Sequence, residues 1–228
     1  MEGNAGAKRV AAEPATSAST PNAPAGRQDS RDSTARKVTV LFFGTSLTAG
    51  YGLEPSQAFP VLIAAKSTAE GVPITAINSG LSGETSAGAL RRIEWTLQRP
   101  VDVVVLETGG NDALRALDAA ALKANLLGIV GKIRKAQPRA RILLAVMEAP
   151  PNLGARYTAS FHEAYSSVAK SEGLTLLPFL LDRVAGKPEL NQDDGVHPNV
   201  AGEKIVADNV WKGLKPAVDS IYATRRDR

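Results

Sequence analysis

Short apolar runs alternate with longer segments of helical periodicity over most of this chain. Five runs rich in β-branched and other apolar residues are bounded by turn-forming residues, as buried strands usually are. They occupy residues 38–43, 74–78, 101–107, 142–147 and 174–177. Because each run is short and is followed by a helical pattern, the alternation predicts parallel strands joined by right-handed helical crossovers.

The segments between these runs carry apolar residues at helical spacing. The clearest one places Leu122, Leu126, Ile129, Val130 and Ile133 on one face, which predicts an amphipathic helix. Further helices are expected at residues 59–69, 87–97, 155–171 and 199 to about 214. Because such helices cover both faces of a parallel sheet, the sequence predicts an α/β fold of three layers, α/β/α.

The two ends of the chain differ from its middle in composition. Residues 1–36 are rich in Ala, Ser, Thr, Pro, Gly and Asn and hold almost no large apolar side chains. Such a segment cannot bury enough surface to offset its ordering entropy, so we expect a disordered tail or linker. The globular domain is expected at residues 37–217, followed by a charged C-terminal tail at residues 218–228.

The first residues of the given sequence are not expected to act as a signal peptide, because no apolar segment follows the first basic residues. Polar tracts of this kind often join a mature exported protein to a cleaved signal or a lipid anchor, which favours a periplasmic or secreted protein. A cytoplasmic protein with a flexible end is the alternative, and the sequence leaves both open.

Composition narrows the partners that the chain can have. Of its 228 residues, 43% are hydrophobic and 22% are charged, the formal net charge is +4, and cysteine is absent. No apolar run approaches the length of a membrane span, and without cysteine there are no disulfides or thiolate metal sites. The densest basic run lacks aromatic side chains on which bases could stack, so no nucleic-acid partner is expected. That run contains Lys132, Arg134, Lys135, Arg139 and Arg141. The oligomeric state is left open.

Polar, glycine-rich loops follow three of the predicted strands, at residues 44–47, 79–83 and 109–112. In open parallel sheets, ligands bind at the carboxyl ends of the strands. Because all three loops follow strands, we expect them to emerge together at this edge of the sheet and to form the functional site there.

The chain holds two histidines, His162 and His197, and they differ in their surroundings. His162 lies in a predicted helix, where a surface or packing role is the default, whereas His197 lies in a polar loop before the last helix. Asp194 stands three residues before His197, close enough to orient its imidazole as a general base. Asp193 is the rival orienting group. A metal site built from these residues is disfavoured, because the loop supplies too few ligands for a closed zinc site.

Ser46 follows the first predicted strand, where a tight turn into a short helix would give it free N–H groups and a positive helix dipole. An ordinary helix cap is the alternative role for a serine there. The motif is not Gly-x-Ser-x-Gly, because Thr48 occupies its last position, so an α/β-hydrolase is disfavoured. Gly83 and Asn111 could supply further donors to an oxyanion, although each alone is typical of a turn.

Four ordered blocks together resemble a known family, the SGNH or GDSL hydrolases, and most closely its bacterial thioesterase I/lysophospholipase L1/arylesterase branch. The blocks are residues 44–51, 78–86, 109–112 and 193–199, and the resemblance extends over about residues 38–214. It implies a flavodoxin-like three-layer sandwich around a five-stranded parallel sheet, with no cofactor and no metal.

The resemblance also implies roles for particular residues. Ser46 corresponds to the catalytic nucleophile, and Asp194 and His197 complete its triad. The oxyanion donors are the N–H groups of Ser46 and Gly83 and the side chain of Asn111. The segment 148–157 is similar to the substrate-lining loop of the branch. Weaker expectations are substrate contacts from Gly110, Pro150 and Tyr157.

One position departs from the family pattern. The first block usually has Asp where this chain has Thr45. A threonine can still hydrogen-bond within the turn, but it cannot hold a negative charge there. The departure therefore leaves open how rigid this loop is and how activity depends on pH.

The favoured function is hydrolysis of short-chain acyl and aryl esters, with thioesters and lysophospholipids as further candidates, through an acyl-serine intermediate on Ser46. A carbohydrate O-acetyl esterase is an alternative, but aromatic residues are only 5% of the chain and offer no obvious sugar platform. A non-catalytic binding protein on the same fold, with Ser46 only a helix cap, is the third hypothesis.

Overall fold

A central sheet of five parallel strands organises the computed structural model, which describes residues 36–227. The strands lie in the order β2-β1-β3-β4-β5, which is the flavodoxin-like order. They are β1 (Val38–Gly44), β2 (Ile74–Gly80), β3 (Val103–Leu106), β4 (Arg141–Val146) and β5 (Thr175–Phe179). The predicted strands and their parallel arrangement are confirmed. The tail expected at residues 1–36 lies outside the described residues, apart from Arg36.

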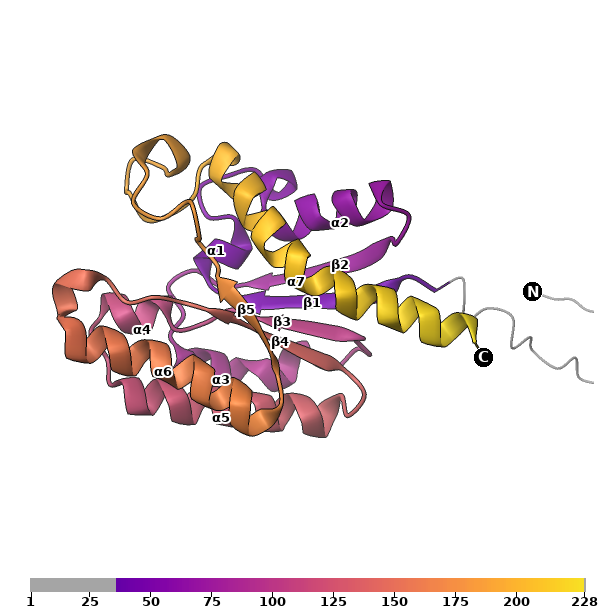
Figure 1. Ribbon diagram of the computed structural model, residues 1–228, viewed down its shortest axis with the longest axis horizontal. Coiled ribbons are helices and arrows are strands. Elements are labelled where there is room, and N and C mark those ends of the chain that lie inside the picture. The colour runs from indigo at the N-terminus through magenta and orange to yellow at the C-terminus, as the bar shows by residue number, and fades with distance from the viewer. Residues whose placement is uncertain (1–35, 228) are drawn as a thin grey trace, which may run out of the picture. The chain divides into compact units, whose positions relative to one another are not determined.

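Helices cover both faces of the sheet, as the alternating pattern predicts (Figure 1). One face carries α3 (Ser86–Thr96), α5 (Ala119–Ala136) and α6 (Ala155–Glu172). The other carries α2 (Phe59–Ala69) and α7 (Val200–Arg226). Among the described residues, no helix is both long enough and apolar enough to cross a membrane.

The short elements lie in the loops that follow the strands. They are the helices α1 (Ser46–Ala49) and α4 (Gly110–Leu114) and the 3-10 turns η2 (Pro55–Gln57), η3 (Pro151–Leu153) and η4 (Pro188–Leu190). The short helix expected at Ser46 is confirmed, whereas α4 was not predicted. Its five residues are too few for a periodic pattern to reveal.

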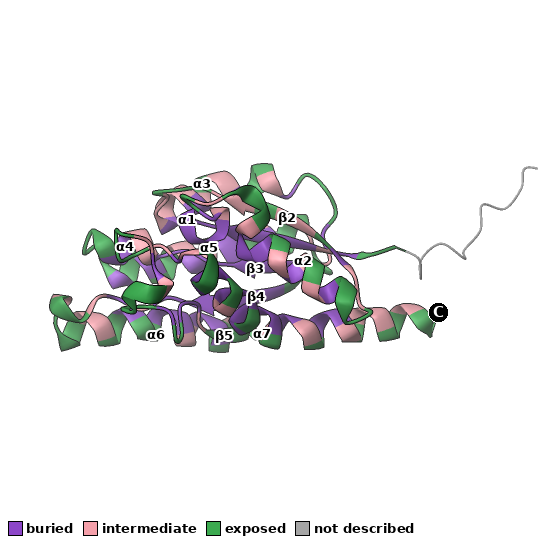
Figure 2. Cartoon of the chain, turned by 90° about the horizontal axis from the view of Figure 1, so that it is seen from above, coloured by how far each residue is buried: buried purple, intermediate pink, exposed green. Residues whose placement is uncertain are grey.

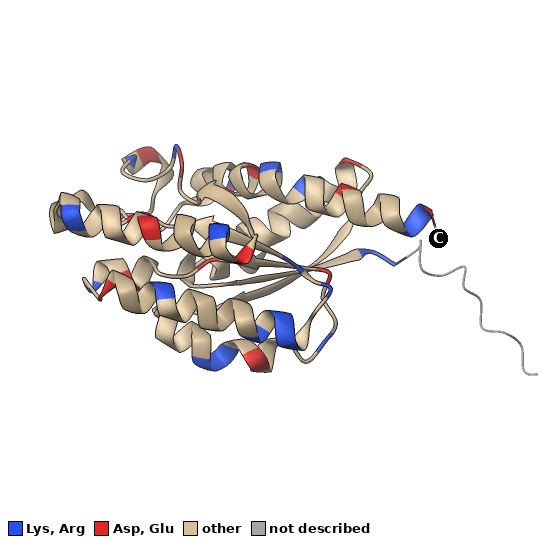
Figure 3. Cartoon of the chain, turned by 60° about the horizontal axis from the view of Figure 1, so that its bottom comes forward, with Lys and Arg blue, Asp and Glu red and all other residues tan. Residues whose placement is uncertain are grey.

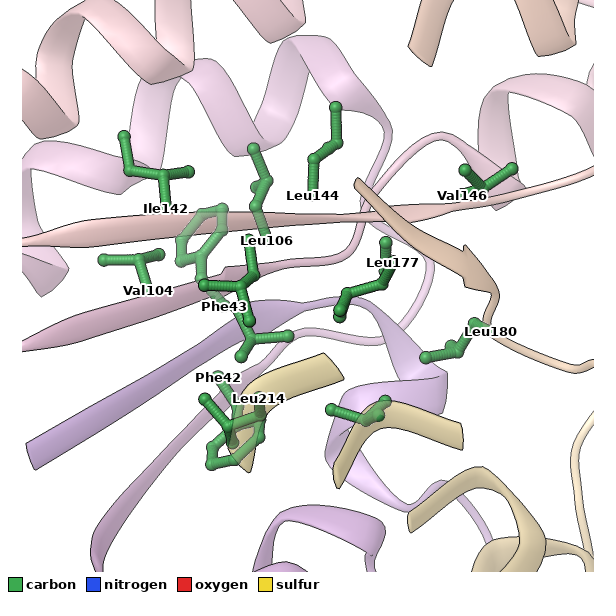
Figure 4. Packing of buried hydrophobic residues seen from close by; sticks show 14 of the residues in the cluster. Phe42, Phe43, Val104, Leu106, Ile142, Leu144, Val146, Leu177, Leu180 and Leu214 are labelled. Carbon is green, nitrogen blue, oxygen red and sulfur yellow. The ribbon is translucent and has the colours of Figure 1, made fainter. Parts of the chain in front are cut away.

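The core consists of two apolar layers, one on each face of the sheet. Strand residues alternate between these layers, since successive side chains point to opposite faces. Phe42 makes an edge contact with Phe59 of α2, with ring centroids 5.8 Å apart, and Leu214 of α7 belongs to the same buried cluster (Figure 4). Phe43 points the other way, where the guanidinium of Arg92 from α3 lies 4.2 Å from its ring centroid. The three central strands β1, β3 and β4 are therefore buried on both sides, whereas the edge strands β2 and β5 are partly exposed (Figure 2).

Helix α7 is longer than the sequence pattern predicts. The helix expected to end near residue 214 continues to Arg226, so that boundary is wrong, and residues 218–226 of the expected tail belong to the helix. The prediction stopped before Pro216, which lacks an N–H and usually disrupts a helix interior. Tertiary contacts stabilise the part of α7 that follows Pro216: Val218 is fully buried, and the Tyr222 hydroxyl donates to Pro73 O.

Charged side chains of both signs are scattered over the outer helices (Figure 3). The basic run at the end of α5 illustrates this arrangement. Lys132 forms an ion pair with Glu94 of α3, and Arg134 forms one with Glu172 of α6. These partners lie on neighbouring helices, so the run takes part in helix packing on this face.

Candidate active site

The loops that follow the first three strands meet the loop before α7 at the carboxyl edge of the sheet. The first places Ser46 at the start of α1, the second carries Gly83, and the third carries Asn111 in α4. Asp194 and His197 come from the loop before α7. All five residues line one pocket of about 730 Å³. The structure thus brings together every residue expected to form the triad and the oxyanion site.

A chain of two hydrogen bonds connects three of these side chains. Ser46 Oγ lies 2.8 Å from His197 Nε2, and His197 Nδ1 lies 2.6 Å from Asp194 Oδ2. If His197 is neutral with its proton on Nδ1, Nε2 is free to accept the serine proton. The geometry is that of a nucleophile, a base and a group that orients the base.

Asp194 is held as a carboxylate by its own loop. Its Oδ1 accepts the backbone N–H groups of Val196 and His197, each at 2.9 Å. These backbone bonds, together with the imidazole of His197, lower the pKa of Asp194 from 3.8 to about 2. Asp193, the rival orienting group, is exposed and does not line the pocket.

Ser46 occupies the first turn of a helix of four residues whose C-terminal end depends on two glycines. Gly50 closes α1 in the left-handed conformation, with φ 72°. A Cβ on Gly80 would lie 2.2 Å from the backbone nitrogen of Ala49, so only glycine allows β2 to pass this close. The N-cap residue of α1 is Thr45, which makes no side-chain capping bond. Ser46 is therefore the first residue of the helix and not its cap.

Gly83 and Asn111, the residues expected to supply oxyanion donors, both line the pocket. Gly83 has φ +76°, a conformation that favours glycine. The Asn111 Nδ2 group donates to Glu84 O at 3.1 Å, which fixes the amide orientation and leaves its second N–H available. Arg92 holds the same loop through a 2.7 Å ion pair with Glu84, and Arg115 donates to Gly83 O at 3.1 Å.

The three residues with weaker expectations of substrate contact differ in whether they line the pocket. Gly110 and Pro150 line the pocket. Tyr157 is not among the lining residues; its hydroxyl donates to Leu117 O at 2.7 Å, and its ring stacks on Phe161. Most of the other wall side chains are apolar, which suits the hydrocarbon part of an ester. They include Leu47, Leu114, Met147, Phe179 and Leu181.

Several residues near the site were missed by the sequence analysis. The ring of Tyr51 lies 4.7 Å from that of His197. The Gln192 amide donates to Tyr51 O at 2.7 Å and to Pro198 O at 2.9 Å. This amide therefore ties the segment after Ser46 to the loop that carries His197. Nothing in the local sequence marks a lone glutamine for such a role.

The second histidine is also close to the pocket. His162 Nδ1 lies 2.7 Å from Oε1 of Glu148, and Glu148 lines the pocket wall. His162 itself is not a lining residue, in keeping with the surface role expected of it. Within residues 36–227, no cluster of three or more His, Cys, Asp or Glu side chains is arranged to hold a metal ion.

Comparisons with known proteins identify the family of the chain. The GDSL-like lipase/acylhydrolase family matches residues 42–205. Esterase TesA of Pseudomonas aeruginosa is 39% identical over 180 residues, which are 78% of this chain and 88% of that protein. Thioesterase 1/protease 1/lysophospholipase L1 of Escherichia coli K12 is 36% identical over 182 residues, 79% of this chain and 85% of that protein.

Solved structures of esterases also match the fold of this chain. A crystal structure of TesA matches with a TM-score of 0.75 and 38% sequence identity, and the match covers 78% of this chain and 99% of that one. A crystal structure of AlinE4, an SGNH-hydrolase family esterase, matches with a TM-score of 0.67 and 36% identity, over 80% of this chain and 97% of that one.

Proposed function

The chain belongs to the GDSL-like lipase/acylhydrolase family and is a serine esterase of the TesA type, and we propose that Ser46 is its nucleophile. In this proposal His197 is the general base and Asp194 orients it. The substrates are short-chain acyl and aryl esters, with thioesters as further candidates. The observation that carries the proposal is the pair of bonds from Ser46 Oγ to His197 Nε2 at 2.8 Å and from His197 Nδ1 to Asp194 Oδ2 at 2.6 Å.

Acylation begins when Ser46 Oγ attacks the ester carbonyl carbon while its proton passes to His197 Nε2. The carbonyl oxygen becomes an oxyanion that accepts hydrogen bonds from the N–H groups of Ser46 and Gly83 and from Asn111 Nδ2. The ionised Asp194 stabilises the imidazolium that forms. When the intermediate collapses, the bond to the alcohol breaks, the alcohol oxygen takes the proton from His197, and the acyl group remains on Ser46.

Deacylation repeats these steps with water. His197 takes a proton from the water, the resulting nucleophile attacks the acyl carbonyl carbon, and the same donors hold the second oxyanion. Collapse breaks the bond to Ser46 Oγ, which regains its proton from His197. A carboxylic acid leaves, and the enzyme returns to its starting state.

The test is the Ser46→Ala variant measured with p-nitrophenyl acetate and with a fluorophosphonate probe. We expect turnover to fall on the order of a million-fold and covalent labelling to disappear, because both need the serine oxygen. Thermal unfolding is the control for the fold. Because the substitution removes only one small hydroxyl, the variant should remain folded. Near-normal turnover by the folded variant would exclude Ser46 as the nucleophile.

A panel of p-nitrophenyl esters of increasing chain length tests the substrate part of the proposal. We expect the highest kcat/KM among the short acyl chains. A steady rise in kcat/KM up to long chains would contradict the short-chain assignment and leave the role of Ser46 intact.

A further inference from the structure

A buried acidic side chain lies directly beneath the start of α1. Glu107 follows β3, and its backbone N–H continues the ladder by donating to Phe43 O at 2.9 Å. Its side chain sits in the interior with 1% of its surface exposed. Glutamate is rarely buried to this extent unless its oxygens are hydrogen-bonded, so its partners indicate what holds it there.

The partners of Glu107 flank Ser46. Oε2 accepts the backbone N–H of Thr45 at 2.7 Å and the hydroxyl of Thr48 at 2.8 Å. The hydroxyl of Thr45 donates to both carboxyl oxygens, at 2.9 and 3.0 Å. Thr45 and Thr48 are themselves buried. One carboxyl group thus holds the residue before Ser46 and the residue two positions after it.

The backbone of the loop makes room for this carboxyl group at Gly44. A Cβ at this position would lie 2.4 Å from Glu107 Oε2 and 2.1 Å from Thr48 Oγ1. Neither distance is possible for a real side chain. The last residue of β1 therefore has to be glycine for Glu107 and Thr48 to meet beside the nucleophile.

Two opposing effects act on the acidity of this group. Burial raises the pKa of Glu107, and the hydrogen bonds from Thr45 and Thr48 lower it. The two hydroxyls can donate to a carboxylate, and either one can turn to accept from a carboxylic acid. The contacts with both threonines can therefore persist in either protonation state.

We propose that Glu107 is a positioning residue for Ser46 and acts through Thr45 and Thr48. The inference rests on the proposed role of Ser46 as nucleophile. The distance from Ser46 Oγ to His197 Nε2 is 2.8 Å. A displacement of a catalytic group by about 1 Å can lower the rate on the order of a hundredfold. Fixing the backbone on both sides of Ser46 is therefore a contribution to turnover and not only to folding.

The same contacts give a reason for the threonine at position 45. Its hydroxyl is a donor toward Glu107. An aspartate there would place a second carboxyl group at hydrogen-bond distance from the first in a buried setting, and the two would have to share a proton. Threonine keeps the contact without this coupled titration.

The experiment compares Thr45→Val, which removes the hydroxyl at nearly constant shape, with Thr45→Ser, which keeps it. The control is Thr108→Val, because the Thr108 hydroxyl is buried in the neighbouring segment with no hydrogen-bond partner among the described residues. For each folded variant we would measure kcat and KM with p-nitrophenyl acetate, the rate of fluorophosphonate labelling, and Tm.

We expect Thr45→Val to lower kcat by about 10- to 100-fold, with KM within about twofold and labelling slowed in parallel. Thr45→Ser should recover most of this loss. Glu107→Leu should behave like Thr45→Val, because it removes both acceptor oxygens from Thr45 and Thr48. If Glu107→Leu does not fold, the comparison of Thr45→Val with Thr45→Ser tests the inference alone.

A purely structural role would lower Tm and leave kcat per folded molecule unchanged. A folded Thr45→Val protein with wild-type kcat and labelling rate would therefore overturn the inference. If Ser46→Ala is inactive in the same assays, the proposed function survives that result. If Ser46→Ala keeps its activity, the proposed function itself fails, so the two failures are distinguishable.

Discussion

At the scale of single residues, the loop that carries Asp194 determines the state of its carboxylate. Its acceptor capacity is used by two backbone N–H groups and one imidazole, all from residues 196 and 197. Because these donors stabilise the charged form, the pKa of Asp194 falls to about 2. The carboxylate is therefore available to His197 at any pH where an esterase is normally assayed.

Replacing Asp194 with Asn should lower kcat by on the order of 10⁴-fold, because an amide can present its N–H₂ to His197 and favour the wrong tautomer. The stabilisation from the lowered pKa is present above pH 3.8 and is lost as pH falls through about 2. Protonation of Asp194 should thus play no part in acid inactivation above about pH 4. The measurements are kcat of Asp194→Asn, with Asp193→Asn as the matched control, and the pH profile of kcat/KM of the wild type. An Asp194→Asn enzyme with wild-type kcat would refute the expectation.

The sequence predicted residues whose chemistry is visible locally and missed those defined by distant contacts. His197 and Asp194 stand three positions apart in a polar loop, so their proximity follows from chain geometry. Glu107 looks like the end of an apolar strand, and its partner Thr45 is 62 positions away. Only the pairing of β1 with β3 places their loops together.

At the scale of elements, the contact between α2 and α7 contains a buried charge-bearing group. Glu203, in the first turn of α7, is 1% exposed and accepts the backbone N–H of Phe59 at 2.7 Å. Helix α2 has no capping side chain of its own at this end, so Glu203 satisfies one of its free N–H groups. Burial outweighs this single bond and raises the pKa of Glu203 to about 8.

Because the folded pKa of about 8 exceeds the ordinary glutamate value of 4.5, the folded state binds more protons than the unfolded state between these values. The free energy of unfolding should therefore fall as pH rises from about 4.5 to 8, by up to about 5 kcal/mol. Glu203→Gln keeps the acceptor and removes this dependence. Urea unfolding at pH 5, 7 and 9 measures the effect, with exposed Glu189→Gln as control. Parallel pH curves for the wild type and Glu203→Gln would contradict the expectation.

At the boundaries of elements, tertiary contacts can override the local sequence pattern. The strands and the middle of each helix follow their periodicity, because the same residues that create the pattern are the ones that are buried. Helix α7 passes Pro216 because its last turns are anchored elsewhere: Arg225 forms a 2.6 Å ion pair with Asp102 and donates to Arg36 O at 2.8 Å. Those anchors lie at the start of β1 and beside β3, and no local rule can foresee them.

At the scale of the whole molecule, the sheet order determines where the chemistry can occur. The sequence passes from β1 to β2 on one side and then to β3 on the other, so the loops after β1 and β3 diverge and open a crevice at the switch point. Ser46 and Asn111 come from these two loops. The mild net charge of +4 belongs to the whole chain and does not describe this crevice. Among residues 36–227, its ionisable lining groups are Glu148, Asp194, His197 and Tyr51, with no lysine or arginine.

The carboxylates that line the pocket therefore present negative charge to its substrate. Asp194 is engaged with His197, and Glu148, whose Oε1 contacts His162 at the pocket edge, supplies the rest. We expect the enzyme to prefer neutral or cationic esters over anionic ones, and Glu148→Gln to raise kcat/KM for an anionic ester by about 3- to 10-fold relative to its neutral analogue. Phenyl acetate, 4-acetoxybenzoate and a trimethylammonium-substituted phenyl acetate form a suitable series, and hemisuccinate esters place the charge on the acyl side.

Glu94→Gln is the matched control, because that carboxylate is exposed on α3 and pairs with Lys132 away from the pocket lining. The preference should weaken as salt is added, since it is a screened Coulomb effect. An unchanged anionic-to-neutral ratio in Glu148→Gln, in both the acyl and the alcohol series, would show that this carboxylate does not select substrates.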